Sequence, residues 1–350
     1  MFVSLGKFVD AVTEILPECT VYLTGSAAMN DYREGWSDLD LLILSGTALT
    51  QDAADVLLNL RQTLSESEPG NSYYRRIEGG VVFAEVFLNC GSGRTVYWGT
   101  SGQRITAGYT ADVFSLAAMD QWRLLHGEDL RNRMKKPSSE MLCNAVKKHA
   151  QTIREHGCTT KNPMYRCGWM LDTARCLYTL KTGRVTAKTN AGEIALRLGW
   201  CPDPAALHDA LAVRYNPEIE KYDVSDSAIL GFLEVLEEVL SRPVVTDPCY
   251  CGHDCGRCLV RCGDPSAREF YRDEMGIELK PEEMHCSGGR TESVMKLCWE
   301  CPMRNCCRSE GILSCIDCRK PCRTYLEYAE QYVNRMGQFT HPDEFVTQST

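Results

Sequence analysis

The sequence predicts an α+β protein in three parts: a mixed sheet with helices, an all-helical domain, and a small cysteine-rich domain stapled by metal. Three observations support this prediction. Strand-like and helix-like segments alternate up to about residue 110, helical periodicity continues to residue 242, and cysteines cluster from Cys249 onward. We therefore expect three domains, which span residues 1–110, 111–242 and 249–337.

The first part has the segments of a small sheet. TVYLTG at 20–25, DLDLLILS at 38–45 and GVVFAEVFLN at 80–89 are short apolar runs rich in β-branched or aromatic residues, which is typical of strands. ALTQDAADVLLNLRQTL at 48–64 has the apolar spacing of a helix. The order strand, strand, helix, strand indicates that helices cover the sheet.

The second part has helix start and stop signals. Predicted helices end at Gly157 and Gly183, and Asp203-Pro204 supplies an N-cap and a first-turn proline for the next helix. Ser225 is a suitable cap for the last helix. The prolines of residues 242–248 mark a linker before the cysteines.

Composition limits the function classes. The net charge of −9 argues against broad nucleic-acid binding, although a local basic groove remains compatible with it. The start, MFVSLGKFVDAVTEILPE, interrupts its apolar residues with Lys7, Asp10 and Glu14, unlike a signal peptide. Since no apolar run reaches membrane-spanning length, we expect a cytoplasmic protein without a membrane partner.

Two aspartates open the second predicted strand. Because strand side chains alternate, Asp38 and Asp40 share one face, while Leu39, Leu41 and Ile43 anchor the other face in the core. Like charges so close together need a cation, and Mg²⁺ prefers one or two carboxylates plus phosphate oxygens. The pair therefore predicts a magnesium and nucleotide site.

Gly25-Ser26, at the end of the first strand, supplies the second half of this site. A glycine lets the backbone approach a ligand closely, and a helix starting there would present N–H groups to phosphate. A third carboxylate should come from the neighbouring strand. Glu85 stands in an otherwise apolar run and is our first candidate, with Glu78 as the alternative.

These motifs resemble the nucleotidyltransferase superfamily: Gly-Ser, a spacer, Asp-x-Asp, and a later strand acid, here within residues 20–90. Residues 171–199, LDTARCLYTLKTGRVTAKTNAGEIALRLG, resemble the helical domain of streptomycin/spectinomycin adenylyltransferases. The resemblance implies transfer of AMP from ATP to a hydroxyl group. The aromatic and acidic residues with which those enzymes bind the drug are not seen between Glu85 and residue 171. The resemblance therefore supports the type of reaction better than the identity of the substrate.

The resemblance also implies residue roles. Asp38 and Asp40 would hold magnesium, and Glu85 would act as the general base and as a further metal ligand. The nucleotide would contact Gly25, Ser26, Arg175, Lys188 and Tyr215. A plain ion pair between Asp172 and Arg175, three residues apart on one helix, is an equally good explanation of those two residues.

Thirteen of the twenty cysteines lie between Cys249 and Cys322, and three pairs have Cys-x-x-Cys spacing. In a reducing compartment this spacing predicts zinc or an iron–sulfur cluster rather than disulfides. The predicted ligands are Cys251, Cys255, Cys258, Cys262, Cys286, Cys298, Cys301, Cys306, Cys315, Cys318 and Cys322. We interpret the seven scattered cysteines as small buried apolar residues.

The cysteine segment resembles a family of small uncharacterised bacterial cysteine-rich proteins, through CGHDCGRC and CIDCRKPC. Gly289 stands where that family often has a cysteine, so Cys249 or Cys307 would have to complete one site. The domain could be structural or could recognise a partner, protein or nucleic acid.

We expect a magnesium-dependent enzyme that uses ATP to adenylylate a hydroxylated small molecule of aminoglycoside type. Two alternatives stay open: a toxin-like nucleotidyltransferase acting on RNA or protein, and a non-catalytic metal or redox sensor. The intact acids Asp38, Asp40 and Glu85 argue against the last of these.

Overall fold

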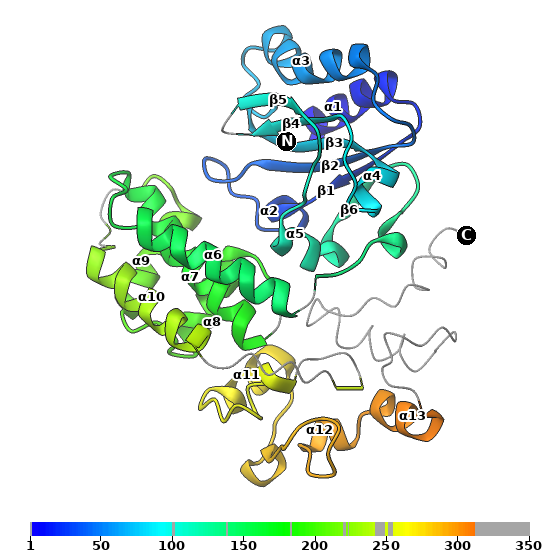
Figure 1. Ribbon diagram of the computed structural model, residues 1–350. Helices are drawn as coiled ribbons and strands as arrows, with labels where there is room; N and C mark the ends of the chain where they lie inside the picture. Colours follow the sequence, from blue (N-terminus) through cyan, green and yellow to red (C-terminus); the bar gives the residue numbers. More distant parts are fainter. Residues whose placement is uncertain are drawn as a thin grey trace. The chain divides into compact units, whose positions relative to one another are not determined.

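Figure 1 shows the computed structural model of the chain. The chain divides into two compact units, Met1–Lys136 and Pro137–Thr350, which are described separately. The residues that the structure describes are 2–99, 102–137, 139–182, 184–219, 222, 224–241, 249–250 and 255–311.

The first unit is built on a six-stranded mixed sheet with the strand order β5-β4-β3-β2-β1-β6. β2 and β3 are parallel, and the other neighbours are antiparallel. A parallel pair needs a crossover connection, and helix α3 (Gln51–Ser67) supplies it. The strands are β1 (Cys19–Leu23), β2 (Leu39–Ser45), β3 (Ile77–Phe83), β4 (Thr95–Gly99), β5 (Gly102–Thr106) and β6 (Arg123–His126).

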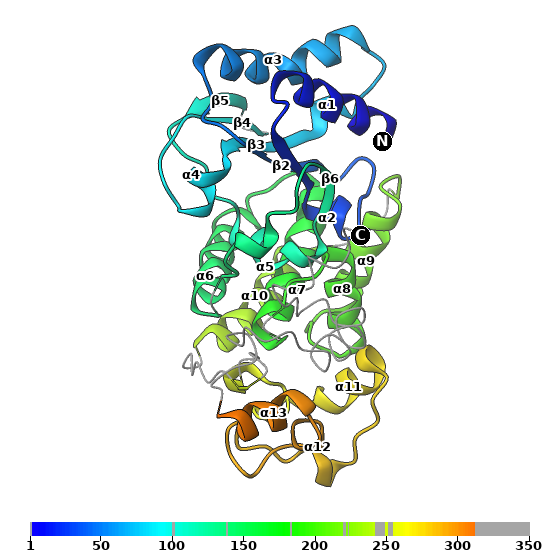
Figure 2. The same ribbon diagram turned by 90° about the vertical axis from the view of Figure 1, so that its right-hand side faces the viewer.

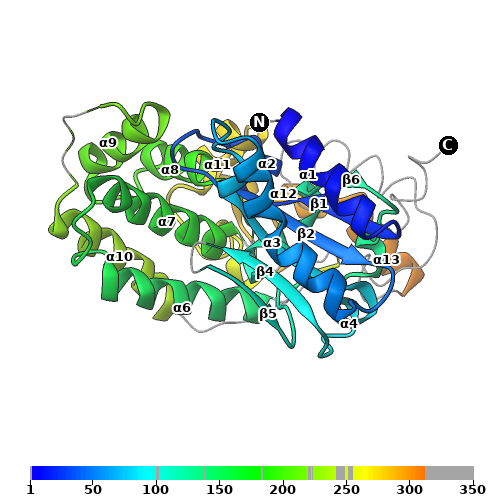
Figure 3. The ribbon, with the colours of Figure 1, turned by 90° about the horizontal axis from the view of Figure 1, so that it is seen from above.

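Strand β2 is buried on both faces, which explains its unbroken apolar run. Leu39, Leu41 and Ile43 pack in one cluster with residues of helices α1 (Phe2–Ile15) and α3, which lie over that face of the sheet (Figure 3). Leu42 and Leu44 pack on the other face, with Met119 and Trp122 among others. The predicted alternation of β2 is confirmed.

Two sequence predictions for this unit are wrong. Residues 111–136 were expected to belong to the all-helical domain. They do contain the short helix α5 (Val113–Ala117), but β6 pairs with β1 and extends the sheet unit beyond residue 110. The third strand ends at Phe83, and residues 84–88 form the short helix α4 (Ala84–Leu88). Short apolar runs suit a strand and a buried helical turn equally well, so periodicity could not locate this change.

The second unit begins with helices packed around α7 (Pro163–Thr182), as Figure 2 shows. Asp203 accepts a hydrogen bond from the Ala206 N–H at 3.0 Å, and Ser225 Oγ accepts one from the Ala228 N–H at 3.1 Å, so both predicted caps are confirmed. The other helices are α6 (Ser139–His156), α8 (Lys188–Arg197), α9 (Pro204–Tyr215) and α10 (Asp226–Ser241).

The described cysteine-rich residues belong to this second unit. Lys181 of α7 forms a partly buried ion pair with Asp264, and Trp200 Nε1 donates to Ser266 Oγ at 2.8 Å. The short helices here are η4 (Cys255–Arg257), α11 (Ala267–Met275), η5 (Pro281–Met284), α12 (Lys296–Trp299) and α13 (Pro302–Glu310). Among the described helices of the whole chain, none combines the length and apolarity that a membrane span requires.

Candidate functional site

The Gly-Ser turn lies directly against Asp40. The Thr24 N–H donates to the Asp40 carbonyl at 2.8 Å, which fixes the end of β1 beside the start of β2. Gly25 has φ +61°, and a Cβ atom placed on it would lie 2.0 Å from Asp40 Oδ2. Only glycine leaves this space and adopts this conformation without strain. Ser26 follows in the first turn of the short helix α2 (Gly25–Ala28).

The neighbouring strand brings Glu78 to this place. β2 and β3 are parallel, and Asp40 is paired in register with Glu78. Paired residues of adjacent strands point to the same face of a sheet. Gly79, with φ +128°, sits so close to β2 that a Cβ atom would lie 1.8 Å from the Leu41 carbonyl oxygen. Two half-buried carboxylates therefore lie near the starts of adjacent strands on one face, and Asp38 is the residue directly before β2.

Glu85 lies at the other end of the strand, and its predicted place beside the aspartates is wrong. Phe83, the last residue of β3, is five residues beyond Glu78, which is about 17 Å along a strand. Glu85 follows in α4, is half-exposed, and accepts a hydrogen bond from Arg133 Nη2 at 2.7 Å. The candidate third carboxylate is therefore Glu78.

Asp38, Asp40 and Glu78 have the chemistry of a magnesium site, since Mg²⁺ takes carboxylate oxygens and completes its shell with water and phosphate. No three or more His, Cys, Asp or Glu side chains of the described residues lie in a group that could by itself hold a metal ion. A magnesium ion that uses two carboxylates together with nucleotide phosphates does not require such a group.

Tyr109 covers the strand next to this site. Its ring lies 2.8 Å from the position of a Cβ atom on Gly80, so a larger residue there would collide with it. Burial raises the pKa of Tyr109, and the nearby charge of Asp40 raises it further. The phenol therefore stays protonated beside the carboxylates. Sequence reasoning missed Tyr109, and only the glycine pair Gly79-Gly80 hinted that something packs closely there.

The helical unit contains a second charged group, centred on Asp172 of α7. Its side chain is only 8% exposed, with Oδ1 2.9 Å from Arg175 Nη2 and Oδ2 3.0 Å from Lys188 Nζ. His149 Nε2 of α6 lies 3.7 Å from Oδ1. Burial by itself would raise the pKa of Asp172, but Lys188, Arg175 and His149 outweigh it, so the pKa is lowered well below its usual range.

Two of the predicted nucleotide-binding residues, Arg175 and Lys188, lie in this group. The ion pair between Asp172 and Arg175 is present, and Lys188 joins it as the first residue of α8. Arg214 Nε donates to Thr189 Oγ1 at 2.9 Å and thereby holds α9 against the start of α8. The next residue, Tyr215, is half-exposed and bonds to Glu193 of α8 through its hydroxyl. Sequence reasoning missed His149, which no motif singled out.

In the cysteine-rich part, two thiols lie around Gly289. The Gly289 N–H donates to Cys255 Sγ at 3.1 Å, and a Cβ atom on Gly289 would lie 3.5 Å from Cys249 Sγ. Cys249 thus fills the space that a side chain at 289 would take, while Cys307 lies by the Tyr250 carbonyl.

The other predicted cysteine ligands differ in burial. Cys258 and Cys301 are buried, Cys286 and Cys298 are half-buried, and Cys262 and Cys306 are exposed. Burial raises the pKa of the Cys258 thiol and that of the Cys298 thiol. The described cysteines form no group of three that could hold a metal ion. The predicted ligands outside the described residues are Cys251, Cys315, Cys318 and Cys322.

Two parts of the chain match known protein families. Residues 5–78 match the family described as Nucleotidyltransferase domain, and residues 248–327 match the family described as Protein of unknown function (DUF3795). No curated protein matches the chain. One similar solved structure is the spectinomycin adenyltransferase AAD(9) from Enterococcus faecialis with ATP and spectinomycin, with a TM-score of 0.49 and 14% identity over 69% of this chain and 100% of that chain.

The chain therefore carries the domain of a class of enzymes, the nucleotidyltransferases, near its N-terminus. At its C-terminus it carries a domain of the DUF3795 family. The resemblances to the nucleotidyltransferase superfamily and to a family of unknown function are thus confirmed, as is the α+β fold with its mixed sheet and following helices.

Proposed function

We propose that this protein transfers AMP from ATP to a hydroxyl group of a small molecule in a magnesium-dependent reaction. One observation carries the proposal: Glu78 is paired in register with Asp40, whose carboxylate packs against Gly25 of the Gly-Ser turn. Carboxylates from two adjacent strands thus lie beside the backbone of a glycine, which has no side chain to keep a ligand away. That arrangement can hold a nucleotide through its phosphates and leave a carboxylate for the acceptor.

In the proposed reaction the acceptor oxygen attacks the α-phosphorus of ATP. The bond from this phosphorus to the oxygen bridging to the β-phosphorus breaks, and pyrophosphate leaves. Glu78 is our candidate for the base that takes the hydroxyl proton, a role that sequence analysis gave to Glu85. Magnesium, when bound by Asp38 and Asp40, would supply charge neutralisation at the phosphates.

Arg175, Lys188 and Tyr215 remain our candidates for contacts to the nucleotide. Arg175 and Lys188 bring two positive charges to the single carboxylate of Asp172, so the group keeps an excess of positive charge. The buried carboxylate also fixes where the two cations lie, and phosphate binding depends on such positioned cations.

The acceptor is proposed from the sequence resemblance alone, as a hydroxylated compound of aminoglycoside type. The experiment is a screen of such compounds, RNA and protein with α-labelled ATP, comparing the wild type with Glu78→Gln. Label on a small molecule that depends on Glu78 supports the proposal. If only RNA or protein is labelled, the acceptor is a macromolecule and not a small molecule. ATP binding without transfer to any acceptor would overturn the proposal that the protein is an enzyme.

For the cysteine-rich domain we propose a structural zinc ion or iron–sulfur cluster. The thiols of Cys249 and Cys255 both lie close to Gly289, whose N–H donates to Cys255 Sγ, and such N–H groups commonly stabilise metal-bound thiolates. Metal analysis of the purified full chain, with an absorption spectrum recorded without oxygen, distinguishes zinc, iron–sulfur and a metal-free domain.

A further inference from the structure

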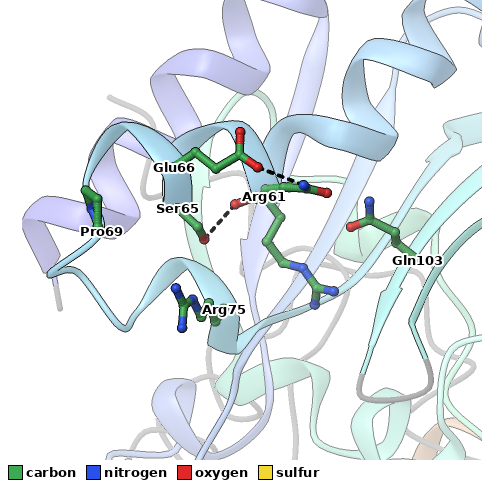
Figure 4. Close-up of a pocket in the computed structure, with 7 residues that line it drawn as sticks. Arg61, Ser65, Glu66, Pro69, Arg75 and Gln103 are labelled. Atoms are coloured by element: carbon green, nitrogen blue, oxygen red, sulfur yellow. Dashed lines mark hydrogen bonds between the residues drawn. The ribbon is translucent and has the colours of Figure 1, made fainter.

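A cavity of about 570 Å³ opens in the sheet unit away from the carboxylates. It is formed by α3, the turn that follows it, and β5 (Figure 4). Helix α3 packs on the sheet face of Leu41 and Ile43, whereas Asp40 shares the opposite face with Leu42 and Leu44. The cavity is therefore separate from the proposed nucleotide site. Its volume falls within the range of small-molecule sites.

Two arginines give this cavity its charge. Arg61 of α3 and Arg75 of η1 (Tyr74–Arg76) both line it, with Glu66 as the only acidic residue among the lining residues. The lining residues are Arg61, Gln62, Ser65, Glu66, Pro69, Arg75 and Gln103. The cavity thus carries a net positive charge in a protein whose formal net charge is −9.

The two arginines are held differently. Arg61 Nη1 donates to the Ile77 carbonyl at 3.0 Å, which orients its guanidinium and leaves its remaining N–H groups for another acceptor. Arg75 is exposed, and within the described part of the chain it makes no hydrogen bond or ion pair. One anchored and one adaptable guanidinium together suit an oxyanion, because each can donate two parallel hydrogen bonds to carboxylate or phosphate oxygens.

The remaining polar groups are mostly occupied within α3. Gln62 Nε2 donates to Glu66 Oε1 at 2.8 Å, and the Ser65 hydroxyl donates to the Arg61 carbonyl at 2.9 Å, as the dashed lines of Figure 4 show. Glu66 is thus tied to its own helix and forms no ion pair with either arginine within the described residues. Gln103 lines the cavity from β5 and adds an amide that can donate to a ligand.

From these contacts we infer a second binding site, for a small oxyanion carrying two or more negative charges. Arg61 is its fixed ligand and Arg75 its mobile ligand. Because Arg61 also holds the carbonyl of Ile77, the residue before Glu78, the bound anion would touch a side chain that supports the start of β3. This inference does not depend on the proposed transferase activity, because the cavity does not include Asp38, Asp40 or Glu78.

The test is calorimetric titration of the full-length protein with inorganic phosphate and, separately, with citrate, at constant ionic strength and without nucleotide or magnesium. The two anions distinguish a phosphate site from a carboxylate site. We expect at least one to bind. Arg75→Gln, whose side chain has no partner among the described residues, should weaken that binding tenfold or more, equal to about 1.4 kcal/mol.

Two further variants make the result decisive. Glu66→Gln removes the negative charge of the cavity and should tighten binding, whereas Arg104→Gln, on β5 but outside the cavity, should leave it unchanged. Arg61→Lys keeps the positive charge but removes the planar guanidinium with its paired N–H donors, so it should weaken binding. Thermal unfolding should show that this variant is still folded. Absence of binding by the wild type, or equal binding by Arg75→Gln and wild type, would overturn the inference.

Discussion

Glu78 and Glu85 stand at the two ends of one short segment, and their surroundings differ. Glu78 is the second residue of β3 and lies in register with Asp40, whereas Glu85 follows the strand in α4 and pairs with Arg133. Their residue type is the same, so what separates them is the strand pairing. The strand register is therefore the reason why Glu78, and not Glu85, is our candidate for the proposed nucleotide site.

The largest effect is expected for Asp40→Asn. The substitution keeps the shape that packs against Gly25 but removes the charge, so we expect transfer of label from ATP to fall by about 10³-fold or more. Rate measurement with saturating ATP checks this. The temperature of thermal unfolding should be little changed. A fully active variant would contradict the proposal that Asp40, at the start of β2, belongs to the active site.

Gly25→Ala should have the next largest effect. A Cβ atom there would sit 2.0 Å from Asp40 Oδ2, so the carboxylate has to move, and displacements near 1 Å cost about 10²-fold in rate. The left-handed backbone at φ +61° adds a stability cost of about 1–2 kcal/mol. Gly6→Ala, in α1 with nothing near its Cβ position, is the matched control and should not lower the rate or the unfolding temperature.

In the helical unit, Asp172→Asn should act on stability. Loss of the buried charge leaves Arg175 and Lys188 side by side, at a cost of about 3 kcal/mol in the free energy of unfolding. Because the pKa of Asp172 is lowered on folding, its stabilisation is complete above the unfolded value of about 4 and is lost as pH falls below it.

Denaturant unfolding of wild type and Asp172→Asn at several pH values tests this sign. The difference between the two proteins should be constant at neutral pH and shrink in acid. Asp226→Asn is a suitable control, because this carboxylate is 59% exposed and its pair with Arg166 should contribute at most about 1 kcal/mol. A difference that grows in acid would contradict the assigned charge state.

The smallest effect is expected for Glu85→Gln on stability. Both partners of the Glu85–Arg133 pair are about half-exposed, so removing it should change the free energy of unfolding by no more than about 1 kcal/mol. Thermal unfolding measures this. A much larger loss would mean that the pair has a structural role beyond a surface contact.

The sequence predicted those features whose determinants are local. The alternation of β2 and the caps Asp203 and Ser225 depend on neighbouring residues only, and the structure contains them. The Gly-Ser turn and Asp-x-Asp likewise form a motif that can be seen without knowing the strand order. These patterns also sufficed to predict the nucleotidyltransferase domain.

The features that sequence missed depend on pairing between distant segments. Nothing near Glu78 or Glu85 says which one faces Asp40, because the register of parallel β2 and β3 is set across the whole α3 crossover. Strand β6 has only four residues, too few for a period, and is a strand because β1 offers it an edge. His149 reaches Asp172 from another helix, which no single-helix spacing predicts.

The most direct test compares Glu78→Gln with Glu85→Gln in the rate of AMP transfer to whichever acceptor the screen identifies. We expect a loss of at least about 10²-fold for Glu78→Gln, the cost of removing a general base, and a rate close to wild type for Glu85→Gln. The reverse outcome, with Glu78→Gln active and Glu85→Gln inactive, would contradict the site at the start of β2 and β3.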